Sequence, residues 1–213
     1  MNKNEKNIEN IIFDIGNVIL NFNLSNVLPA FTNNKEDQKF ILDNIINSPE
    51  WLGYALIDTG YVTRDEAIEM VKDRTNHTND ELIDEFWCNY NKYASIDNRV
   101  IELIKKLKEN NYKVYLLSNI NLYTHEFVKT SGLFDIVDGY VLSYVEHQIK
   151  PYKSIYNTLI NRYNLICEEC LFVDDKEDNV LTANSFGIHG KNVVPDDYDS
   201  IISLLEKYNI NFN

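Results

Sequence analysis

The sequence predicts an α/β fold, in which a parallel sheet of about five strands is flanked by helices. Short runs of apolar and β-branched residues recur along the chain, and the first of them covers Ile11–Val18. Such runs are typical of strands that are buried on both faces. Segments with apolar residues at helical spacing lie between them, and from residue 98 onward strands and helices alternate. This alternation is the pattern of a parallel sheet with crossover helices.

The predicted elements of the alternating region follow in a regular order. The first is a helix whose apolar residues, Val100, Leu103, Ile104 and Leu107, fall at helical spacing and which ends at the Asn110–Asn111 break. The chain then continues as a strand over 114–117, a helix over about 123–130 closed by Gly132, a strand around 136–143, a helix after Pro151, a strand over 171–173, a helix ending near Gly187, a last strand to Val194 and a C-terminal helix.

The segment from residue 22 to residue 94 interrupts this alternation and is helical in character. Thr63 with Glu66, and Thr78 with Glu81, have the spacing of capping boxes, in which two side chains bond each other's backbone amides at a helix start. We therefore expect a core domain of residues 1–21 and 95–213, with a helical domain of residues 22–94 inserted after the first strand. A chain of 213 residues suits one domain with such an insertion.

The composition is that of an ordinary globular protein, with 44% apolar and 25% charged residues. No apolar run approaches the roughly 18 residues of a membrane span, and the Asn- and Lys-rich N-terminus lacks the apolar centre of a signal peptide. We therefore expect a cytoplasmic protein without a membrane partner. A net charge of −13 also argues against a double-stranded nucleic acid partner, because the phosphate backbone demands a basic surface.

Polar residues follow several of the predicted strands at the point where each strand ends. Asp14 ends the first strand, Ser118 and Asn119 follow the second, and Asp174 and Asp175 follow the strand over 171–173. In open parallel sheets ligands bind at this edge, and the small Gly16 lets the backbone turn tightly there. Each motif also has a simple structural interpretation, since Asp and Ser commonly cap turns and helix starts.

Two further polar residues complete the set. Lys150 lies in a loop before Pro151, and Asn179 lies four residues after Asp175. A lysine is usually a solvated surface residue, so Lys150 alone indicates little. The ordered set of Asp, Ser, Lys and an acidic pair, each after a predicted strand, nevertheless resembles the haloacid dehalogenase (HAD) superfamily, whose members are mostly phosphohydrolases. The resemblance extends from about Ile8 to the last strand near Val194.

The resemblance implies a Rossmann-like core, with residues 22–94 as a cap, and assigns roles to four residues. Asp14 is the nucleophile, which forms an aspartyl-phosphate that water later hydrolyses. Ser118 and the backbone amide of Asn119 hydrogen-bond the phosphate oxygens. Lys150 neutralises the nucleophile and the phosphate together. The expected partner is therefore a small phosphorylated molecule.

A magnesium ion is the expected cofactor, because a carboxylate that attacks an anionic phosphate needs the repulsion screened. Mg²⁺ favours a few carboxylates, a carbonyl and retained waters. Asp14 and Asp175 would supply carboxylates and Gly16 a backbone oxygen, with Asp174 as a further direct or water-mediated contact. Asn179 would orient this set of ligands. The cation and the lysine would together make the site locally positive within an acidic protein.

The sequence departs from the superfamily pattern at Gly16. Most phosphatases of the superfamily have a second Asp two residues after the nucleophile, which protonates the leaving oxygen and then activates water. General acid–base catalysis is worth about 10²–10⁴-fold. The chain is therefore slow, selective for easy leaving groups, or supplied with a proton from elsewhere. The pattern Asp-x-Gly-Asn-Val resembles a branch that contains bacterial sugar-phosphate phosphatases of the glucose-1-phosphatase type.

The sequence offers few substitutes for the missing acid. His147 lies three residues before Lys150, and histidine is a common proton carrier near neutral pH, although a loop histidine is usually just exposed. Trp51, Tyr54 and Asp58, with Gly60, resemble the substrate-facing stretch of such caps. Trp51 and Tyr54 are equally typical of a cap core, where aromatic residues fill space.

Three hypotheses follow. The first is a magnesium-dependent phosphatase that acts on a small phosphorylated metabolite, such as a sugar phosphate or another phosphate with a good leaving group. The second is a haloacid dehalogenase-type hydrolase, which also uses an Asp without the second carboxylate but has no need of the acidic pair. The third is a non-catalytic protein that binds a phosphorylated metabolite or a protein partner. The magnesium dependence of phosphate release distinguishes all three.

Overall fold

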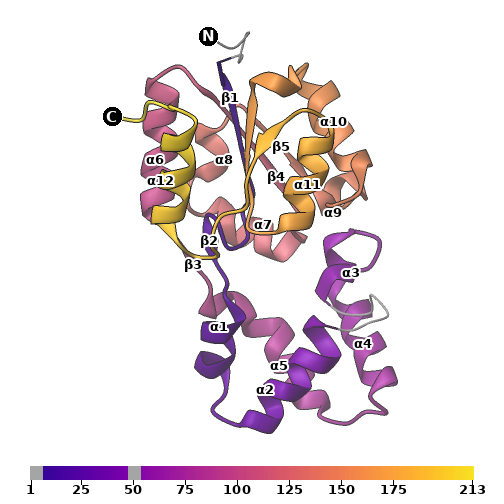
Figure 1. Ribbon diagram of the computed structural model, residues 1–213. Helices are drawn as coiled ribbons and strands as arrows, with labels where there is room; N and C mark the ends of the chain where they lie inside the picture. The colour runs from indigo at the N-terminus through magenta and orange to yellow at the C-terminus, as the bar shows by residue number, and fades with distance from the viewer. Residues whose placement is uncertain (1–6, 48–53) are drawn as a thin grey trace.

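The structure is a computed structural model that describes residues 7–47 and 54–213. Within these ranges five strands form one parallel sheet in the order β5-β4-β1-β6-β7 (Figure 1). The strands are β1 (Asn10–Phe13), β4 (Lys113–Ser118), β5 (Gly139–Leu142), β6 (Cys170–Val173) and β7 (His189–Gly190). The predicted α/β fold with a parallel sheet of about five strands is thereby confirmed.

Helices cover both faces of the sheet, because successive residues of each strand point to opposite sides. Ile11 and Phe13 of β1 pack into one apolar cluster, and Ile12 packs into another. The first cluster lies under α6 (Asn98–Glu109), α8 (Leu133–Ile136) and α12 (Tyr198–Lys207), and the second lies under α10 (Lys153–Tyr163) and α11 (Glu177–Ser185). Two further helices, α7 (Leu122–Lys129) and α9 (Ser143–Glu146), follow β4 and β5. This double coverage explains why consecutive residues of β1, β4 and β6 are apolar, as in Ile11–Phe13.

Two predicted strands are shorter in the structure. The segment Leu133–Ile136 forms α8 after Gly132, which has a φ of 75°, so β5 begins only at Gly139. β7 ends at Gly190 because the chain then leaves the sheet, and the amide of Val193 donates to the carbonyl of Asp174 beyond the end of β6.

Within residues 24–47 and 54–93 the regular elements are all helical, and they have an apolar core of their own. They are α1 (Leu24–Phe31), α2 (Lys35–Ile41), the π-helical η1 (Leu42–Ile46), α3 (Tyr54–Asp58), α4 (Arg64–Arg74), α5 (Asp80–Asn89) and the 3₁₀ segment η2 (Tyr90–Tyr93). We call this part the cap. The two connections to the sheet pair with each other as β2 (Leu20–Asn21) and β3 (Ser95–Ile96). The cap also contacts the sheet part at a second place, where α3 lies against α9 (Figure 1).

One of the two predicted capping boxes is present. At the start of α4, the Glu66 amide donates to Thr63 Oγ1 at 3.2 Å and the Thr63 amide donates to Glu66 Oε2 at 2.9 Å. The predicted box at Thr78 is wrong. The residue before α5 is Asn79, which has a φ of 63° and no side-chain capping bond, so the chain enters this helix through a left-handed residue.

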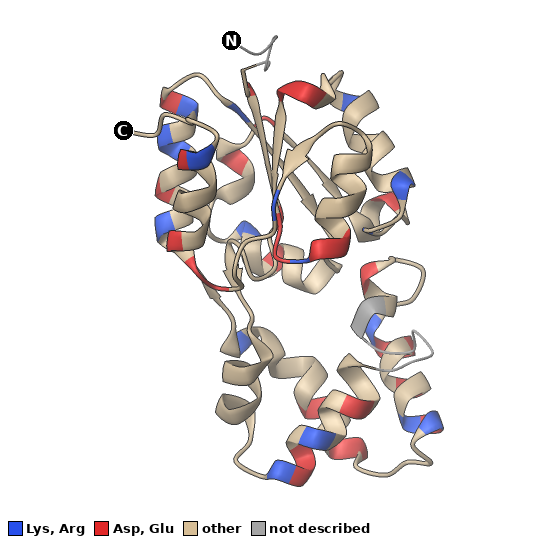
Figure 2. Ribbon diagram, in the orientation of Figure 1, with Lys and Arg blue, Asp and Glu red and all other residues tan. Residues whose placement is uncertain are grey.

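Charged side chains of both signs are interspersed on the helices of both parts (Figure 2). In the described part of the chain, no helix combines the length and the apolar character needed to cross a bilayer.

Candidate active site

The strand order brings three of the sequence-predicted side chains to one edge of the sheet. β1 lies between β4 and β6, and Asp14, Ser118 and Asp174 stand at or directly after the carboxyl ends of these strands. Asp14 and Ser118 line a cavity of about 520 Å³ to which the cap also contributes, and Asp174 is fully buried beside it. Asp175, Lys150, Asn119, Asn179 and Gly16 line the same cavity.

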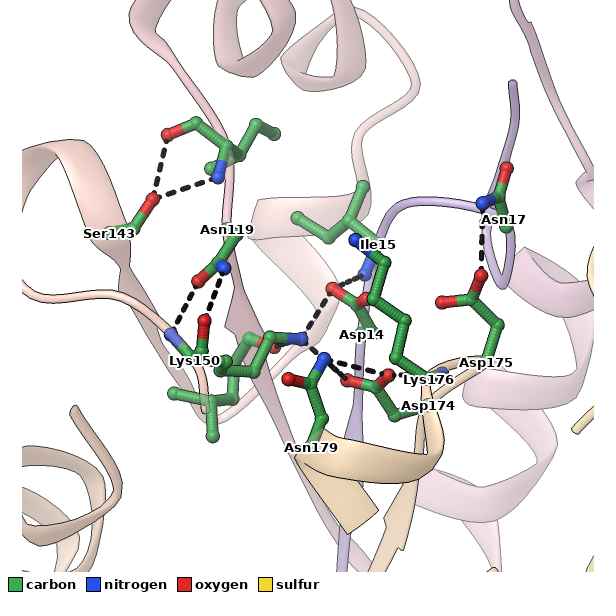
Figure 3. A network of polar contacts seen from close by, with 12 residues as sticks. Asp14, Ile15, Asn17, Asn119, Ser143, Lys150, Asp174, Asp175, Lys176 and Asn179 are labelled. Carbon is green, nitrogen blue, oxygen red and sulfur yellow. Dashed lines mark hydrogen bonds and ion pairs between the residues drawn. The ribbon is translucent and has the colours of Figure 1, made fainter. Parts of the chain in front are cut away.

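Lys150 is the centre of the polar network at this edge (Figure 3). Its Nζ lies 2.9 Å from Asp14 Oδ1 and 2.6 Å from Asp174 Oδ2, and it donates to the Leu117 carbonyl at 2.8 Å. The side chain is only 1% exposed. Burial alone would lower the pKa of Lys150, but the Asp14 and Asp174 carboxylates outweigh it and raise the pKa above its ordinary value. Lys150 is therefore a buried, permanent positive charge.

Asn119 holds the backbone of Lys150 in place. Asn119 Nδ2 donates to the Lys150 carbonyl at 2.9 Å, and the Lys150 amide donates to Asn119 Oδ1 at 2.8 Å (Figure 3). Sequence reasoning considered only the backbone amide of Asn119 and missed this role of its side chain. Because the two residues are 31 positions apart, no local pattern indicates the pairing.

Asp14 is buried and its Oδ1 is held from two sides. The Ile15 amide donates to this oxygen at 2.7 Å, and Lys150 contacts it as described. Burial raises the pKa of Asp14 to about 6, Lys150 opposes the shift, and the Asp174 and Asp175 carboxylates add to it. The carboxyl group is thus positioned by the lysine and is crowded by two further acids.

Asp14, Asp174 and Asp175 form a group that is able to hold a metal ion, since each offers an oxygen within 4.8 Å of the others. Asp174 is oriented by Asn179 Nδ2, at 3.0 Å from both oxygens, and by the Lys176 amide at 2.8 Å. Three carboxylates against the single charge of Lys150 leave excess negative charge, which fits a hard divalent cation with oxygen ligands.

Ser118 and Asp175 each present a polar group to the same region. Ser118 Oγ is buried and, among the described residues, accepts and donates no hydrogen bond of normal geometry, although it lies near enough to Asp14 to lower the pKa of that carboxyl. Asp175 Oδ2 accepts from Asn17 Nδ2 at 3.0 Å (Figure 3). The Ser118 hydroxyl is therefore free to bond a ligand in the cavity.

Gly16 lines the cavity and lies in the tight turn that the sequence predicts, since the amides of Val18, Ile19 and Leu20 all donate to the Ile15 carbonyl. The residue with a left-handed backbone is Asn17, with a φ of 55°, whereas Gly16 is not among the residues of positive φ. A Cβ atom at Gly16 would meet nothing within 4 Å. The position therefore leaves open space where a longer side chain would stand.

The remaining sequence-predicted residues are His147, Trp51 and Tyr54. His147 is exposed, lies outside the cavity lining, bonds the Thr59 carbonyl through Nδ1 at 3.1 Å and stacks on Tyr61 at 4.7 Å between ring centroids. Trp51 lies outside the described residues, and Tyr54 is the first residue of α3.

A hydrogen-bonded group joins the cap to the sheet part at the cavity. Asn121, the N-cap of α7, donates through Nδ2 to Asp58 Oδ1 of α3 at 2.9 Å. Tyr90 of the cap places its hydroxyl 3.2 Å from Asn121 Oδ1 and 2.9 Å from Thr124 Oγ1. Sequence reasoning did not single out Asn121, although its spacing to Thr124 is that of an N-cap.

The family of the chain follows from a match to a family model. A model described as haloacid dehalogenase-like hydrolase matches residues 8–187, which include every residue of the polar network described above. The chain belongs to this family of hydrolases. The family membership that four short sequence motifs predicted is thereby confirmed.

Two curated HAD relatives are similar over most of their length. The chain is 25% identical over 196 residues to a sesquiterpene phosphatase of Aspergillus oryzae, covering 92% of each chain. It is 26% identical over 189 residues to a D-ribitol-5-phosphate phosphatase of Bacteroides thetaiotaomicron, covering 84% of this chain and 89% of the relative.

Solved structures of HAD proteins have the same fold. A predicted HAD-like hydrolase from Porphyromonas gingivalis superposes with a TM-score of 0.74 at 22% identity, covering 95% of this chain and 98% of that one. A HAD enzyme of Bacteroides thetaiotaomicron, in complex with magnesium and inorganic phosphate, superposes with a TM-score of 0.68 at 24% identity, covering 91% and 98%.

Proposed function

We propose that this chain is a magnesium-dependent phosphatase that hydrolyses a small phosphorylated metabolite through an aspartyl-phosphate on Asp14. The observation that carries the proposal is the contact of one buried lysine with both Asp14 and Asp174, next to a third carboxylate. This arrangement positions a nucleophile while leaving an oxygen-rich site for a cation. In this proposal residues 1–21 and 95–213 are the catalytic core, and residues 22–94 are the cap.

The chain's own residues supply most of what phosphoryl transfer requires. Lys150 lowers the negative charge that an incoming phosphate meets at Asp14. Ser118, with its unbonded hydroxyl, donates to a phosphate oxygen. Asp14, Asp174, Asp175 and the Gly16 carbonyl would hold Mg²⁺, and Asn179 keeps Asp174 in orientation. The bound ion would screen the repulsion between the carboxylate and the phosphate.

The acidic cluster favours a phosphatase over a dehalogenase. A dehalogenase needs one carboxylate nucleophile and gains nothing from a cation, whereas three clustered carboxylates without a cation repel each other. Both curated relatives act on phosphorylated substrates, and a protein of the same fold binds magnesium and inorganic phosphate. These similarities support the same chemistry here.

The cavity lining indicates a substrate with both polar and apolar surface. Leu20, Phe22, Leu24 and Ile46 contribute apolar surface, and the other lining residues from the connections and the cap include Asn23, Asn47 and Asp58. We propose a sugar phosphate, or another phosphate whose leaving group departs readily, as the substrate class.

The test is a panel of phosphorylated metabolites, which contains sugar phosphates, sugar-alcohol phosphates, isoprenoid phosphates and aryl phosphates, assayed for inorganic phosphate with Mg²⁺ or with a chelator. We expect release from at least one member, and we expect the chelator to abolish it. Halide release from a 2-haloacid without any phosphate release would support the dehalogenase hypothesis instead. Saturable binding of phosphorylated compounds without turnover would support the non-catalytic one.

A second prediction concerns the contact of the cap with α9. Gly60 has a φ of 72°, and a Cβ atom there would overlap the carbonyl of Tyr144. Gly60→Ala should therefore displace α3 from the sheet part and lower kcat/KM by about 10²-fold, because small displacements of positioning groups are costly. Gly132→Ala is the matched control, since its φ is 75° but its Cβ would approach only a side-chain oxygen of Asp135, at 4.0 Å. Equal activity losses in the two variants would argue against a role for this contact.

A further inference from the structure

The proposed reaction lacks a proton donor for the leaving oxygen, and the residues that line the cavity limit the choice. In the described part of the chain the titratable side chains of the lining are Asp14, Asp58, Lys150, Asp175 and Lys176. Asp14 and Asp175 belong to the acidic cluster, and Lys150 is held between two carboxylates. Only Asp58 and Lys176 are left outside that network, and Lys176 is exposed.

Asp58 is a buried carboxyl group that the cap brings to the cavity. It is the last residue of α3, and it is 9% exposed. Its Oδ1 is fixed by Asn121 Nδ2 at 2.9 Å, whereas its Oδ2 has no hydrogen-bond partner among the described residues. One oxygen is thus held in orientation, and the other is available to a ligand.

The charges around Asp58 favour a group that gains and loses a proton near neutral pH. Burial has the largest effect and raises the pKa of Asp58 to about 7; the Asn121 hydrogen bond and Lys176 oppose this, and Asp14 adds to it. Charged side chains on the elements packed against α3 are engaged elsewhere: Arg64 of α4 lies over the Tyr123 ring, Asp43 of η1 pairs with Lys39, and Glu146 of α9 pairs with Arg162.

We propose that Asp58 is the general acid and base of the reaction, in place of the Asp that Gly16 lacks. This role rests on the proposed function. In the first step Asp14 bonds to phosphorus while the bond between phosphorus and the leaving oxygen breaks. The electron pair of that bond goes to the leaving oxygen, which takes the proton of Asp58 and departs as an alcohol.

The second step returns both groups to their starting state. The Asp58 carboxylate takes a proton from a water molecule whose oxygen bonds to phosphorus. The bond between phosphorus and the Asp14 oxygen breaks, its electron pair returns to Asp14, and inorganic phosphate leaves. No other reactant is consumed. Because the donor stands on the cap, leaving groups that need a proton are expelled only while the cap covers the cavity.

The test compares wild type with Asp58→Asn on a series of substituted phenyl phosphates and alkyl phosphates. For alkyl phosphates we expect kcat/KM to fall by about 10²–10⁴-fold, with a much smaller loss for the most acidic phenol. As the basicity of the leaving group rises, kcat/KM should fall gently in wild type and steeply in Asp58→Asn. The wild-type activity toward alkyl phosphates should also fall as the pH rises through about 7, since Asp58 is then deprotonated. This decline of activity with pH should be absent in Asp58→Asn. Asp65→Asn, an exposed carboxyl on the cap, is the matched control.

A second variant separates proton donation from a structural role. A Cβ atom at Gly16 has open space around it, so Gly16→Asp in the Asp58→Asn background should recover activity on alkyl phosphates by about tenfold or more. The role of Asp58 would be overturned if Asp58→Asn lost the same factor in kcat/KM for every leaving group and Gly16→Asp restored none of it. An active wild type would in that case still support the proposed function. A wild type that releases no phosphate from any member of the series would overturn both.

Discussion

Replacing Asp14 by asparagine is expected to lower phosphate release by about 10⁴-fold or more, because the variant has no oxygen nucleophile to form the aspartyl-phosphate. The amide oxygen of Asn still accepts from the Ile15 amide and from Lys150, so the local geometry should persist. Burial and the neighbouring acids disfavour a charge at this position, as the raised pKa of Asp14 indicates. The variant should therefore be at least as stable as wild type when both are measured without metal.

The measurements are the rate of phosphate release, the mass of acid-quenched enzyme and the melting temperature. Wild type should gain the mass of one phosphoryl group during turnover, and Asp14→Asn should not. Asp199→Asn, an exposed carboxyl on α12, controls for the loss of one negative charge. Activity of Asp14→Asn within a few-fold of wild type would contradict covalent catalysis by this residue.

Removal of the Asp175 side chain is expected to remove the response to magnesium. Loss of groups that only orient metal ligands costs about 10–100-fold in affinity, so loss of a direct ligand should weaken Mg²⁺ binding by about 10²-fold or more. Asp175→Ala also leaves Asn17 Nδ2 without its acceptor, but the buried contacts of Lys150 with Asp14 and Asp174 are untouched. The fold should therefore survive.

Magnesium binding is best measured directly by calorimetry, alongside the magnesium dependence of activity. Asp178→Ala is the matched control, because it removes an exposed carboxylate from the first turn of the same helix, α11. Wild-type magnesium affinity in Asp175→Ala would exclude Asp175 as a ligand. If Asp175→Ala and Asp178→Ala lost magnesium affinity equally, the cause would be the loss of a negative charge and not the loss of a ligand.

The location of the positive charge explains how an acidic chain is able to handle an anionic ligand. Lys150 is buried between two carboxylates that offset its charge, so Lys150 together with a cation held by the acidic cluster would supply the positive charge that a phosphate meets. The reciprocal bonds of Asn119 to the Lys150 backbone hold the loop that carries it. A net charge of −13 is therefore compatible with a locally favourable phosphate site.

Local patterns in the sequence were sufficient for the fold class and for the residues at the sheet edge. Apolar runs such as Ile11–Phe13 must be covered on both faces, and this requirement alone indicates a parallel sheet under helices. The residues that follow such runs meet at one edge, which is why Asp14 and Asp174 were predicted to be neighbours. In the structure Lys150 bonds both of them.

Only the tertiary structure decided how the cap completes the cavity. The bond from Asn121 to Asp58 joins residues 63 positions apart, and the open space at Gly16 depends on how several segments pack around it. The left-handed entry into α5 likewise replaced a capping box that spacing alone predicted. Strand and helix patterns arise from the burial of a segment's own side chains, so a short stretch of sequence is enough to show them. A contact between cap and core depends on the relative placement of two separately packed parts, which no local pattern encodes.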